Sequence, residues 1–327
     1  MNFALEVDSV DQSFRTGFWM RPVRVLNEVS LRVPLGSIFG FVGSNGAGKT
    51  TLIHLLAGLR HPTAGKVQVF GFEASSIEAR LRIGYLPERP YFHEHLTGNQ
   101  LLKYYGALSG LAPKKILDRI PIVLESVGMT HARDRELRHY SKGMLQRIGI
   151  AQALIHNPPV LILDEPMSGL DPLGRREVRE LLLRLSSEGH TIFFSSHILS
   201  DVEEICDQIA LIHQGKILGF GPIGKFLSVH SLETEIIFQG IDESQMSGVM
   251  EFKTCNKIPG GFKGLVMGQE GVGQALSQLI GKGAKIRSVM PVRVSLEHYF
   301  EKVNLQDQKP WVEGSVISND QANRNEA

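Results

Sequence analysis

A run of glycines followed by a lysine and threonines lies near the start of the chain. The residues are, in order, Gly43, Ser44, Asn45, Gly46, Ala47, Gly48, Lys49, Thr50 and Thr51. Glycines let consecutive backbone N–H groups converge on phosphate oxygens, and the lysine adds positive charge at the β and γ phosphates of a nucleotide. The pattern predicts a nucleotide phosphate site, with the Thr50 hydroxyl as a ligand of Mg²⁺. The alternative, a glycine-rich turn whose lysine faces solvent, is disfavoured by the strand and helix patterns on either side.

Two adjacent carboxylates follow a short apolar run further along the chain. Residues 160–163 are Val, Leu, Ile and Leu, the pattern of a buried parallel strand, and Asp164 and Glu165 come directly after them. Ligands of open α/β sheets collect at the carboxyl ends of the strands. We therefore expect Asp164 to bind Mg²⁺ and Glu165 to polarise an attacking water. A strand that simply ends in surface acids is the alternative, and the phosphate site makes it less favourable.

The residues before the carboxylates alternate between strand and helix patterns. Residues 29–33 and 38–42 have strand patterns, and the second leads into the glycine-rich segment. Residues 88–140 are expected to form a mainly helical insertion, with a capping box at Thr97 and a second helical stretch, 113–128, that Pro121 interrupts.

The same alternation continues around and after the carboxylates. Ser141 is expected to cap a helix that ends near Ile155, residues 191–195 to form a buried strand, and Ser200 to cap one more helix. Strands alternating with helices predict an α/β fold with a parallel sheet core over about residues 1–225. The helical insertion occupies about residues 88–155 of this domain.

A second, smaller α/β domain is expected over residues 226–305. Its strand patterns are 233–239, 262–267 and 284–290, and its helical patterns are 272–282 and 295–304. Residues 306–327 are polar and rich in asparagine, so we expect a disordered tail.

Composition excludes several classes of protein. Lys and Arg number 35 and Asp and Glu 34 of 327 residues, so a net charge of +1 gives no general attraction for nucleic acid. Cys206 and Cys255 show neither metal-site spacing nor a disulfide framework. No apolar run approaches the roughly 18 residues of a membrane-spanning helix, and the first residues do not resemble a signal peptide. We therefore expect a soluble cytoplasmic protein.

The order of these motifs resembles the ATP-binding subunit of an ATP-binding cassette (ABC) transporter over about residues 5–225. In that resemblance residues 43–50 are the Walker A loop, 160–165 the Walker B strand, and 168–171 the D-loop. His197 corresponds to the switch histidine, which contacts the γ phosphate and holds Glu165 and the water in line. The resemblance implies a P-loop NTPase fold that binds ATP and Mg²⁺, with Lys49, Glu165 and His197 as catalytic residues.

Two motifs depart from the family pattern. The signature is Tyr-Ser-Lys-Gly-Met at residues 140–144, which keeps Ser141 and Gly143 but lacks the usual glutamine. The resemblance implies that these two residues meet the γ phosphate of ATP held by a second subunit, so the site requires a dimer. Lys142 either adds charge there or is solvated. Glu88 replaces the usual Q-loop glutamine, and it is expected to bind near the nucleotide as an anionic ligand of Mg²⁺.

An aromatic residue near the first strand pattern corresponds to the family's adenine-stacking residue. Phe14 aligns with it, and Phe18 and Trp19 are alternatives. The variant motifs and the added C-terminal domain resemble the ABC-2 type branch of exporters.

This resemblance also predicts the partners of the chain. They are an identical or paired cassette subunit and a separate transmembrane permease docked near residues 88–110, which would place the chain peripherally on the cytoplasmic face of the membrane. No nucleic acid partner is expected. The alternative is a non-transport ABC ATPase that acts on a ribosome, DNA or a regulatory partner.

Overall fold

The computed structural model describes residues 3–17, 19–227, 233–242, 252–291 and 296. The chain divides into two compact units, the first reaching Ile223 and the second beginning at Gly224. Apart from Leu296, the predicted helix at 295–304 and the predicted tail at 306–327 lie outside the described residues. In the part of the chain that is described, every helix is too short or too polar to span a bilayer.

A six-stranded sheet with the order β10-β9-β3-β8-β7-β6 forms the centre of the first unit. Its strands are β3 (Ile38–Val42), β6 (Ile83–Leu86), β7 (Val160–Leu163), β8 (Thr191–Ser196), β9 (Gln208–His213) and β10 (Lys216–Pro222). All neighbouring pairs are parallel except β9 with β10. The α/β fold with a parallel sheet core is therefore confirmed. Its interior strands are apolar because helices and the second sheet cover both faces.

A four-stranded antiparallel sheet, with the order β2-β1-β4-β5, packs against the other side of helix α1 (Lys49–Leu56). Its strands are β1 (Phe3–Thr16), β2 (Arg21–Pro34), β4 (Ala64–Val69) and β5 (Phe72–Glu73). Only part of β2 was expected from the sequence. The strand β1 does not alternate regularly because its pairing with β2 shifts register between Val7 and Gln12, and Ser9 and Glu28 have positive φ angles of 48° and 51°.

The core of the first unit lies where α1 packs between these sheets. Leu52, Ile53 and Leu56 of α1 are completely buried. On the parallel sheet the rings of Phe39 and Phe193 stack at a centroid distance of 5.6 Å. Burial of each such side chain contributes roughly 2–3 kcal/mol, so this core fixes the strand ends that carry the polar residues of the site.

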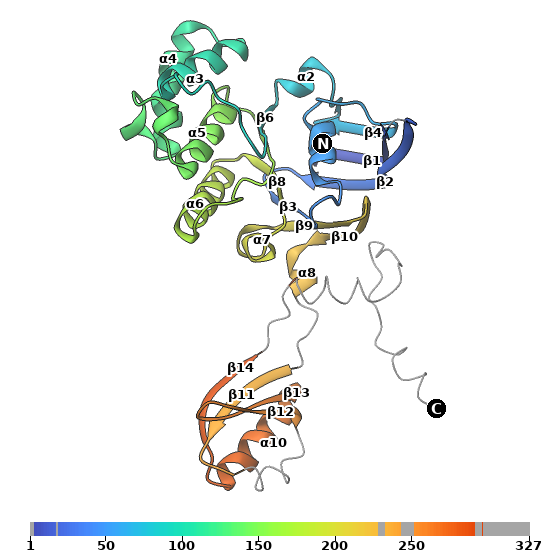
Figure 1. Ribbon diagram of the computed structural model, residues 1–327, viewed down its shortest axis with the longest axis vertical. Helices are drawn as coiled ribbons and strands as arrows, with labels where there is room; N and C mark the ends of the chain where they lie inside the picture. Colours follow the sequence, from blue (N-terminus) through green and yellow to red (C-terminus); the bar gives the residue numbers. More distant parts are fainter. Residues whose placement is uncertain (1–2, 18, 228–232, 243–251, 292–295, 297–327) are drawn as a thin grey trace. The chain divides into compact units, whose positions relative to one another are not determined.

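The remaining helices of the first unit lie around the two sheets and in a helical cluster beside them (Figure 1). They are α2 (Ile77–Arg80), α3 (Gly98–Leu108), α4 (Pro113–Ser126), α5 (Lys142–Leu154), α6 (Pro172–Ser187) and α7 (Leu199–Ile205), with 3-10 turns at Thr130–Ala132 and Leu137–His139, and α8 (Ile223–Leu227) at the boundary of the units. The expected capping box is present, because Thr97 and Gln100 exchange side-chain to backbone hydrogen bonds. The expected cap at Ser141 is also present, with its hydroxyl accepting from Met144 N–H.

Two local predictions are wrong. Helix α4 continues through Pro121 instead of being interrupted there. Pro121 is on the exposed face of α4, so water can bind the carbonyl that the missing N–H leaves free. Ser200 does not cap α7, which begins at Leu199 without a side-chain cap. The hydroxyl of Ser196 instead accepts from Ile198 N–H and fixes the turn before the helix.

The second unit is a four-stranded antiparallel sheet, β12-β13-β11-β14, with helix α10 (Gly268–Gly281) packed on one face. Its strands are β11 (Glu233–Gln239), β12 (Phe252–Ile258), β13 (Gly261–Met267) and β14 (Lys285–Pro291). The sequence did not predict β12, because a register shift between Phe252 and Thr254 removes the alternation that marks a strand.

Candidate nucleotide-binding site

The glycine-rich segment forms a tight loop between β3 and α1. Gly46 and Gly48 have φ angles of 81° and 109°, which glycine adopts without strain. A Cβ atom on Gly43 would lie 2.4 Å from the carbonyl oxygen of Ile212, so this position has no room for a side chain. The loop is thereby shaped to present its N–H groups, and the first turn of α1 continues it.

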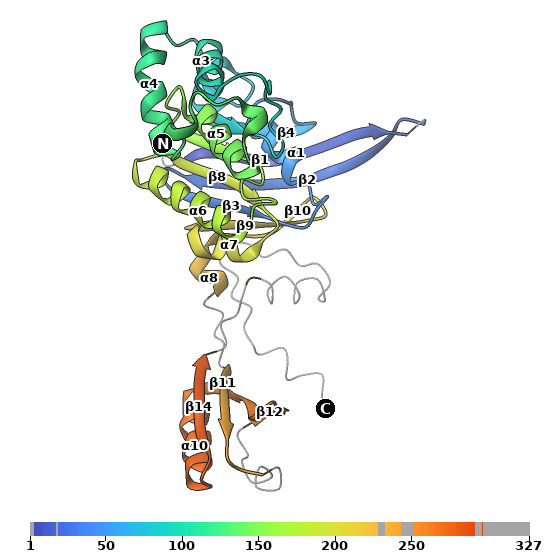
Figure 2. The same ribbon diagram turned by 60° about the vertical axis from the view of Figure 1, so that its left-hand side comes forward.

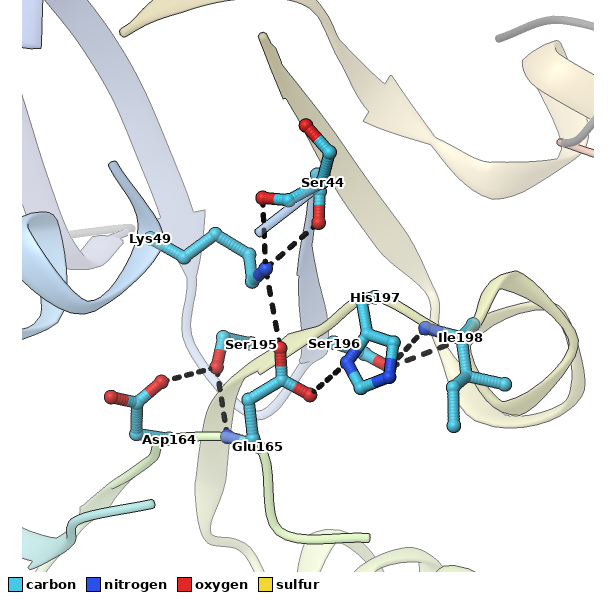
Figure 3. Close-up of polar contacts among 9 residues, drawn as sticks. Ser44, Lys49, Asp164, Glu165, Ser195, Ser196, His197 and Ile198 are labelled. Atoms are coloured by element: carbon cyan, nitrogen blue, oxygen red, sulfur yellow. Dashed lines mark hydrogen bonds and ion pairs between the residues drawn. The ribbon is translucent and has the colours of Figure 1, made fainter. Parts of the chain in front are cut away.

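Lys49 lies beneath this loop and is 6% exposed. Its Nζ donates to the carbonyl oxygens of Gly43 at 2.8 Å and Ser44 at 3.3 Å. It also lies 3.2 Å from Oε1 of Glu165, which makes a buried ion pair (Figure 3). The structure therefore joins the phosphate loop directly to the residue that follows β7.

Glu165 is held between two nitrogenous side chains. Its second oxygen, Oε2, accepts a hydrogen bond from Nδ1 of His197 at 2.7 Å (Figure 3). Glu165 is 8% exposed and its φ angle is 49°, a left-handed conformation that is costly for a residue with a side chain. Strained backbone of this kind persists only where surrounding contacts impose it, and it is common at functional sites.

The contact that holds this backbone comes from Ser195, on β8. Its hydroxyl accepts from the N–H of Glu165 at 2.8 Å and donates to Oδ1 of Asp164 at 2.6 Å. Ser195 is completely buried and Asp164 is 1% exposed, so both hydrogen bonds are shielded from water. One hydroxyl thus orients both carboxylate residues at the end of β7.

Two partly buried residues, Tyr85 and His54, have pKa values that respond to Asp164 and to burial. Burial, and secondarily the charge of Asp164, raise the pKa of Tyr85 to about 12. Burial lowers the pKa of His54, and the charge of Asp164 opposes this shift. Both residues therefore stay neutral near pH 7, so neither places a positive charge beside Asp164.

A cavity of about 380 Å³ opens above these residues. Most of its lining was predicted from the sequence, and the lining residues are Val25, Asn45, Gly46, Gly48, Lys49, Thr50, Thr51, Glu88, Glu165, Ser168 and His197. Gly43, Ser44 and Ala47 belong to the same loop but do not line the cavity, and neither does Asp164, which accepts a hydrogen bond from Ser195. The structure therefore brings the predicted phosphate loop, Glu88, Glu165 and His197 around one cavity.

Three further predicted residues, on other elements, also do not line this cavity. Phe14 is on β1, and the guanidinium of Arg60 lies over its ring at 5.1 Å from the centroid. Ser141 and Gly143 begin α5. The neighbouring Lys142 reaches the D-loop, because a Cβ atom on Gly169 would lie 1.9 Å from its Nζ. Lys142 is exposed, and this approach to the D-loop of its own chain is neither of the two alternatives expected for it.

Sequence reasoning missed Ser195 and Val25 as site residues. Ser195 was visible as a polar residue directly after the apolar run 192–194, in a strand buried throughout, a pattern that indicates a buried hydrogen bond. Val25 carries no such signal, because an apolar residue on a strand is ordinary.

Comparisons with known proteins agree with this geometry. The sequence profile of the family described as ABC transporter matches residues 26–168. An uncharacterized ABC transporter ATP-binding protein of Synechocystis sp. is 40% identical over 299 residues, which are 90% of this chain and 83% of that protein. The bacitracin transport ATP-binding protein BcrA of Enterococcus faecalis is 33% identical over 93% of this chain and 97% of that protein.

One similar solved structure is described as the ATP-binding subunit of an ABC transporter. It is 30% identical to this chain, and the match covers 68% of this chain and 91% of that protein with a TM-score of 0.60. The matched fold therefore corresponds to the first unit in size.

Proposed function

This chain belongs to the ABC transporter family as an ATP-binding subunit with ATPase activity, and we propose that it hydrolyses ATP in the cavity beside Lys49, Glu165 and His197. The observation that carries this proposal is the contact chain from Lys49 to Glu165 to His197 at the cavity wall. It joins a phosphate-binding cation, a carboxylate base and an orienting imidazole.

Each of these residues has a distinct role in the proposal. Lys49 balances the charge of the β and γ phosphates. Glu165 is the general base that polarises the attacking water, a contribution of roughly 10²–10⁴-fold in rate. His197 orients the Glu165 carboxylate through the 2.7 Å hydrogen bond. Ser195 holds the backbone of Glu165 in position by accepting a hydrogen bond from its N–H.

Mg²⁺ is the metal that the family implies, and the donor set fits it. Thr50 and Glu88 line the cavity and carry side-chain oxygens, and Asp164 directly follows β7. Mg²⁺ prefers oxygen ligands and is commonly held by one or two carboxylates together with substrate phosphates. When bound, it would neutralise developing charge on those phosphates. We assign Thr50 and Asp164 to it, with Glu88 as an additional anionic ligand.

We propose that the catalytic unit contains two cassettes. Ser141 and Gly143 stand at the N-terminal end of α5, where backbone N–H groups and the helix dipole favour an anion. They do not line the cavity of their own chain. A second copy supplying these residues would complete each site, and Lys142 would keep the signature segment next to the D-loop of the same chain.

We further propose that the cassette pair drives a separate membrane permease and that the transporter is an exporter. The similarity to the bacitracin transport ATP-binding protein BcrA, over nearly its whole length, supports a role in transport, and the export direction is proposed from the resemblance to the ABC-2 type branch. The expected docking region at residues 88–110 carries exposed aromatic groups, including Tyr91 at 92% and Tyr104 at 47% exposure. The chain would then lie on the cytoplasmic face of the membrane through its partner. The adenine base is assigned to Phe14 by resemblance alone.

Substitution of the base tests the proposed chemistry. Glu165→Gln keeps the size of the side chain and its acceptor for His197, so ATP binding and nucleotide-dependent dimerisation should remain. ATP turnover, measured as phosphate release, should fall by at least about 10²-fold. Glu177→Gln, on the exposed surface of α6, is the matched control. Full turnover by Glu165→Gln would exclude this residue as the base, and copurification of an integral membrane protein would test the proposed permease.

A further inference from the structure

The β1–β2 hairpin projects well beyond the body of the first unit (Figure 2). Its strands remain paired out to Thr16 and Arg21. The connecting turn is closed by a hydrogen bond from Met20 N–H to the Gly17 carbonyl oxygen at 3.1 Å. The described residues at the end of the hairpin are therefore joined by backbone hydrogen bonds, and they do not line the nucleotide cavity.

Large apolar side chains gather at this end, although they are surrounded by water. Trp19 is 79% exposed, Met20 57% and Val23 47%. Single exposed apolar residues are common on protein surfaces, but a tryptophan and a methionine side by side at the end of a projection form a contiguous patch. Such patches mark surfaces that contact another molecule.

Positive charge surrounds the same patch. Arg15, Arg21 and Arg24 are all exposed, and residues 15–27 contain no aspartate or glutamate. Arg24 is paired with Asp11, further from the end. Arg15 and Arg21 stand on opposite faces of the hairpin, since Arg15 pairs with Pro22 and Arg21 with Thr16 in the ladder. Both faces of the apolar end are thus basic.

We propose that the end of the β1–β2 hairpin binds the surface of an anionic lipid bilayer. Tryptophan concentrates at the boundary between headgroups and acyl chains, and arginines beside it attract anionic headgroups. A hairpin that enters end-on would place Trp19 and Met20 in this boundary and leave Arg15 and Arg21 at headgroup level on its two sides. A protein partner would not require arginines on both faces of an apolar hairpin end. The contact is independent of the permease and of the proposed ATPase residues.

Vesicle binding by the full chain tests the proposal. The probes are vesicles of phosphatidylcholine alone and of phosphatidylcholine mixed with phosphatidylglycerol, and binding is measured by cosedimentation at two salt concentrations. Trp311→Phe leaves Trp19 as the remaining tryptophan, so its fluorescence should shift to shorter wavelength on the anionic vesicles. Binding should weaken at high salt because exposed charges are screened.

Two double variants at the hairpin end separate the contribution of the arginines to vesicle binding from the contribution of the apolar side chains. Arg15→Gln with Arg21→Gln should weaken binding to anionic vesicles about 30-fold, since each basic residue near such a surface contributes roughly fivefold. Trp19→Ser with Met20→Ser should abolish the fluorescence shift and weaken binding about tenfold or more. The matched control is Leu117→Ser with Lys115→Gln on α4, where Leu117 is 58% exposed. It should bind like the unmodified chain.

Two results would overturn the proposal. One is equal vesicle binding by the unmodified chain and both hairpin variants, at unchanged unfolding temperature. The other is no vesicle binding by the unmodified chain together with loss of a copurifying protein from the hairpin variants, which would identify a protein partner instead. Neither result depends on the proposed ATPase mechanism, which phosphate release measures separately.

Discussion

Ser195 offers the sharpest test of how the fold shapes the proposed catalytic site. Replacing Ser195 with alanine removes the donor to Asp164 Oδ1 and the acceptor for Glu165 N–H. Both partners are almost fully buried, at 1% and 8% exposure. Leaving a buried polar group without a partner costs about 1–3 kcal/mol. The two losses, together with the space left by the hydroxyl, should lower the free energy of unfolding by about 2–4 kcal/mol.

The functional effect of Ser195→Ala should exceed a simple loss of stability. Without its hydrogen bond, the strained backbone of Glu165 can relax, and Asp164 loses the group that fixes one of its oxygens. We expect a higher Mg²⁺ concentration for half-maximal ATP turnover and a lower kcat. Nucleotide affinity measured with EDTA should change little, because the phosphate loop does not contact Ser195.

The assay compares three variants by urea unfolding and by Mg²⁺ titration of phosphate release. Ser195→Thr retains the hydroxyl and should recover most of the Mg²⁺ response. Ser196→Ala removes a neighbouring hydroxyl that bonds only within its own turn, to Ile198, and serves as the control for general destabilisation. If Ser195→Ala matched the unmodified chain in both stability and Mg²⁺ requirement, the assignment of Ser195 as a positioning residue would be wrong.

Three further outcomes follow from the structure. Gly43→Ala should abolish measurable ATP binding, because the added Cβ would lie 2.4 Å from the Ile212 carbonyl oxygen and displace the loop; calorimetric binding equal to that of the unmodified chain would contradict this. Arg179→Met leaves the buried Asp201 carboxylate without its 2.6 Å partner and should cost about 3–5 kcal/mol, with Asp201→Asn in the same chain restoring part of the loss in urea unfolding. Burial lowers the pKa of His156 below 6.5, so the unfolded chain binds more protons than the folded chain as the pH falls through 6.5. The contribution of neutral His156 to the free energy of unfolding should therefore be fully present above pH 6.5 and decline below it. His156→Gln should reduce this loss of stability at low pH, measured by thermal unfolding across a pH series.

Most of the site was predictable because its functional residues lie in short contiguous segments of the sequence. The phosphate loop, Asp164 and Glu165 each combine a residue type with a local pattern, and their order along the chain is informative. The link made by Ser195 is different, because it depends on the parallel register of β7 with β8, which places Leu163 beside Phe194 and therefore Asp164 next to Ser195. Strand register arises from packing across the sheet, which spacing along the chain does not reveal.

The same limit applies to the fold. Parallel strands β3, β7 and β8 were predicted from apolar runs, because they are buried on both faces, whereas β6 and β9 were not predicted. Strands β1 and β12 were missed where bulges interrupt the alternation of side chains. The left-handed backbone of Glu165 was equally invisible, since that residue type does not favour it.

The donors of Lys49 suggest how ATP binding and activation of the base are connected. Its ammonium group has three N–H donors. Two of them donate to the Gly43 and Ser44 carbonyl oxygens, and the ammonium group also forms the 3.2 Å ion pair with Glu165. A phosphate oxygen that binds Lys49 would therefore compete with Glu165 for the remaining donor and for the positive charge. The two carbonyls belong to the loop that also binds the phosphates, whereas Glu165 can move its carboxylate by side-chain rotation. Phosphate binding should accordingly release Glu165 from Lys49 while the His197 hydrogen bond remains, so the proposed base becomes available only when its substrate is present.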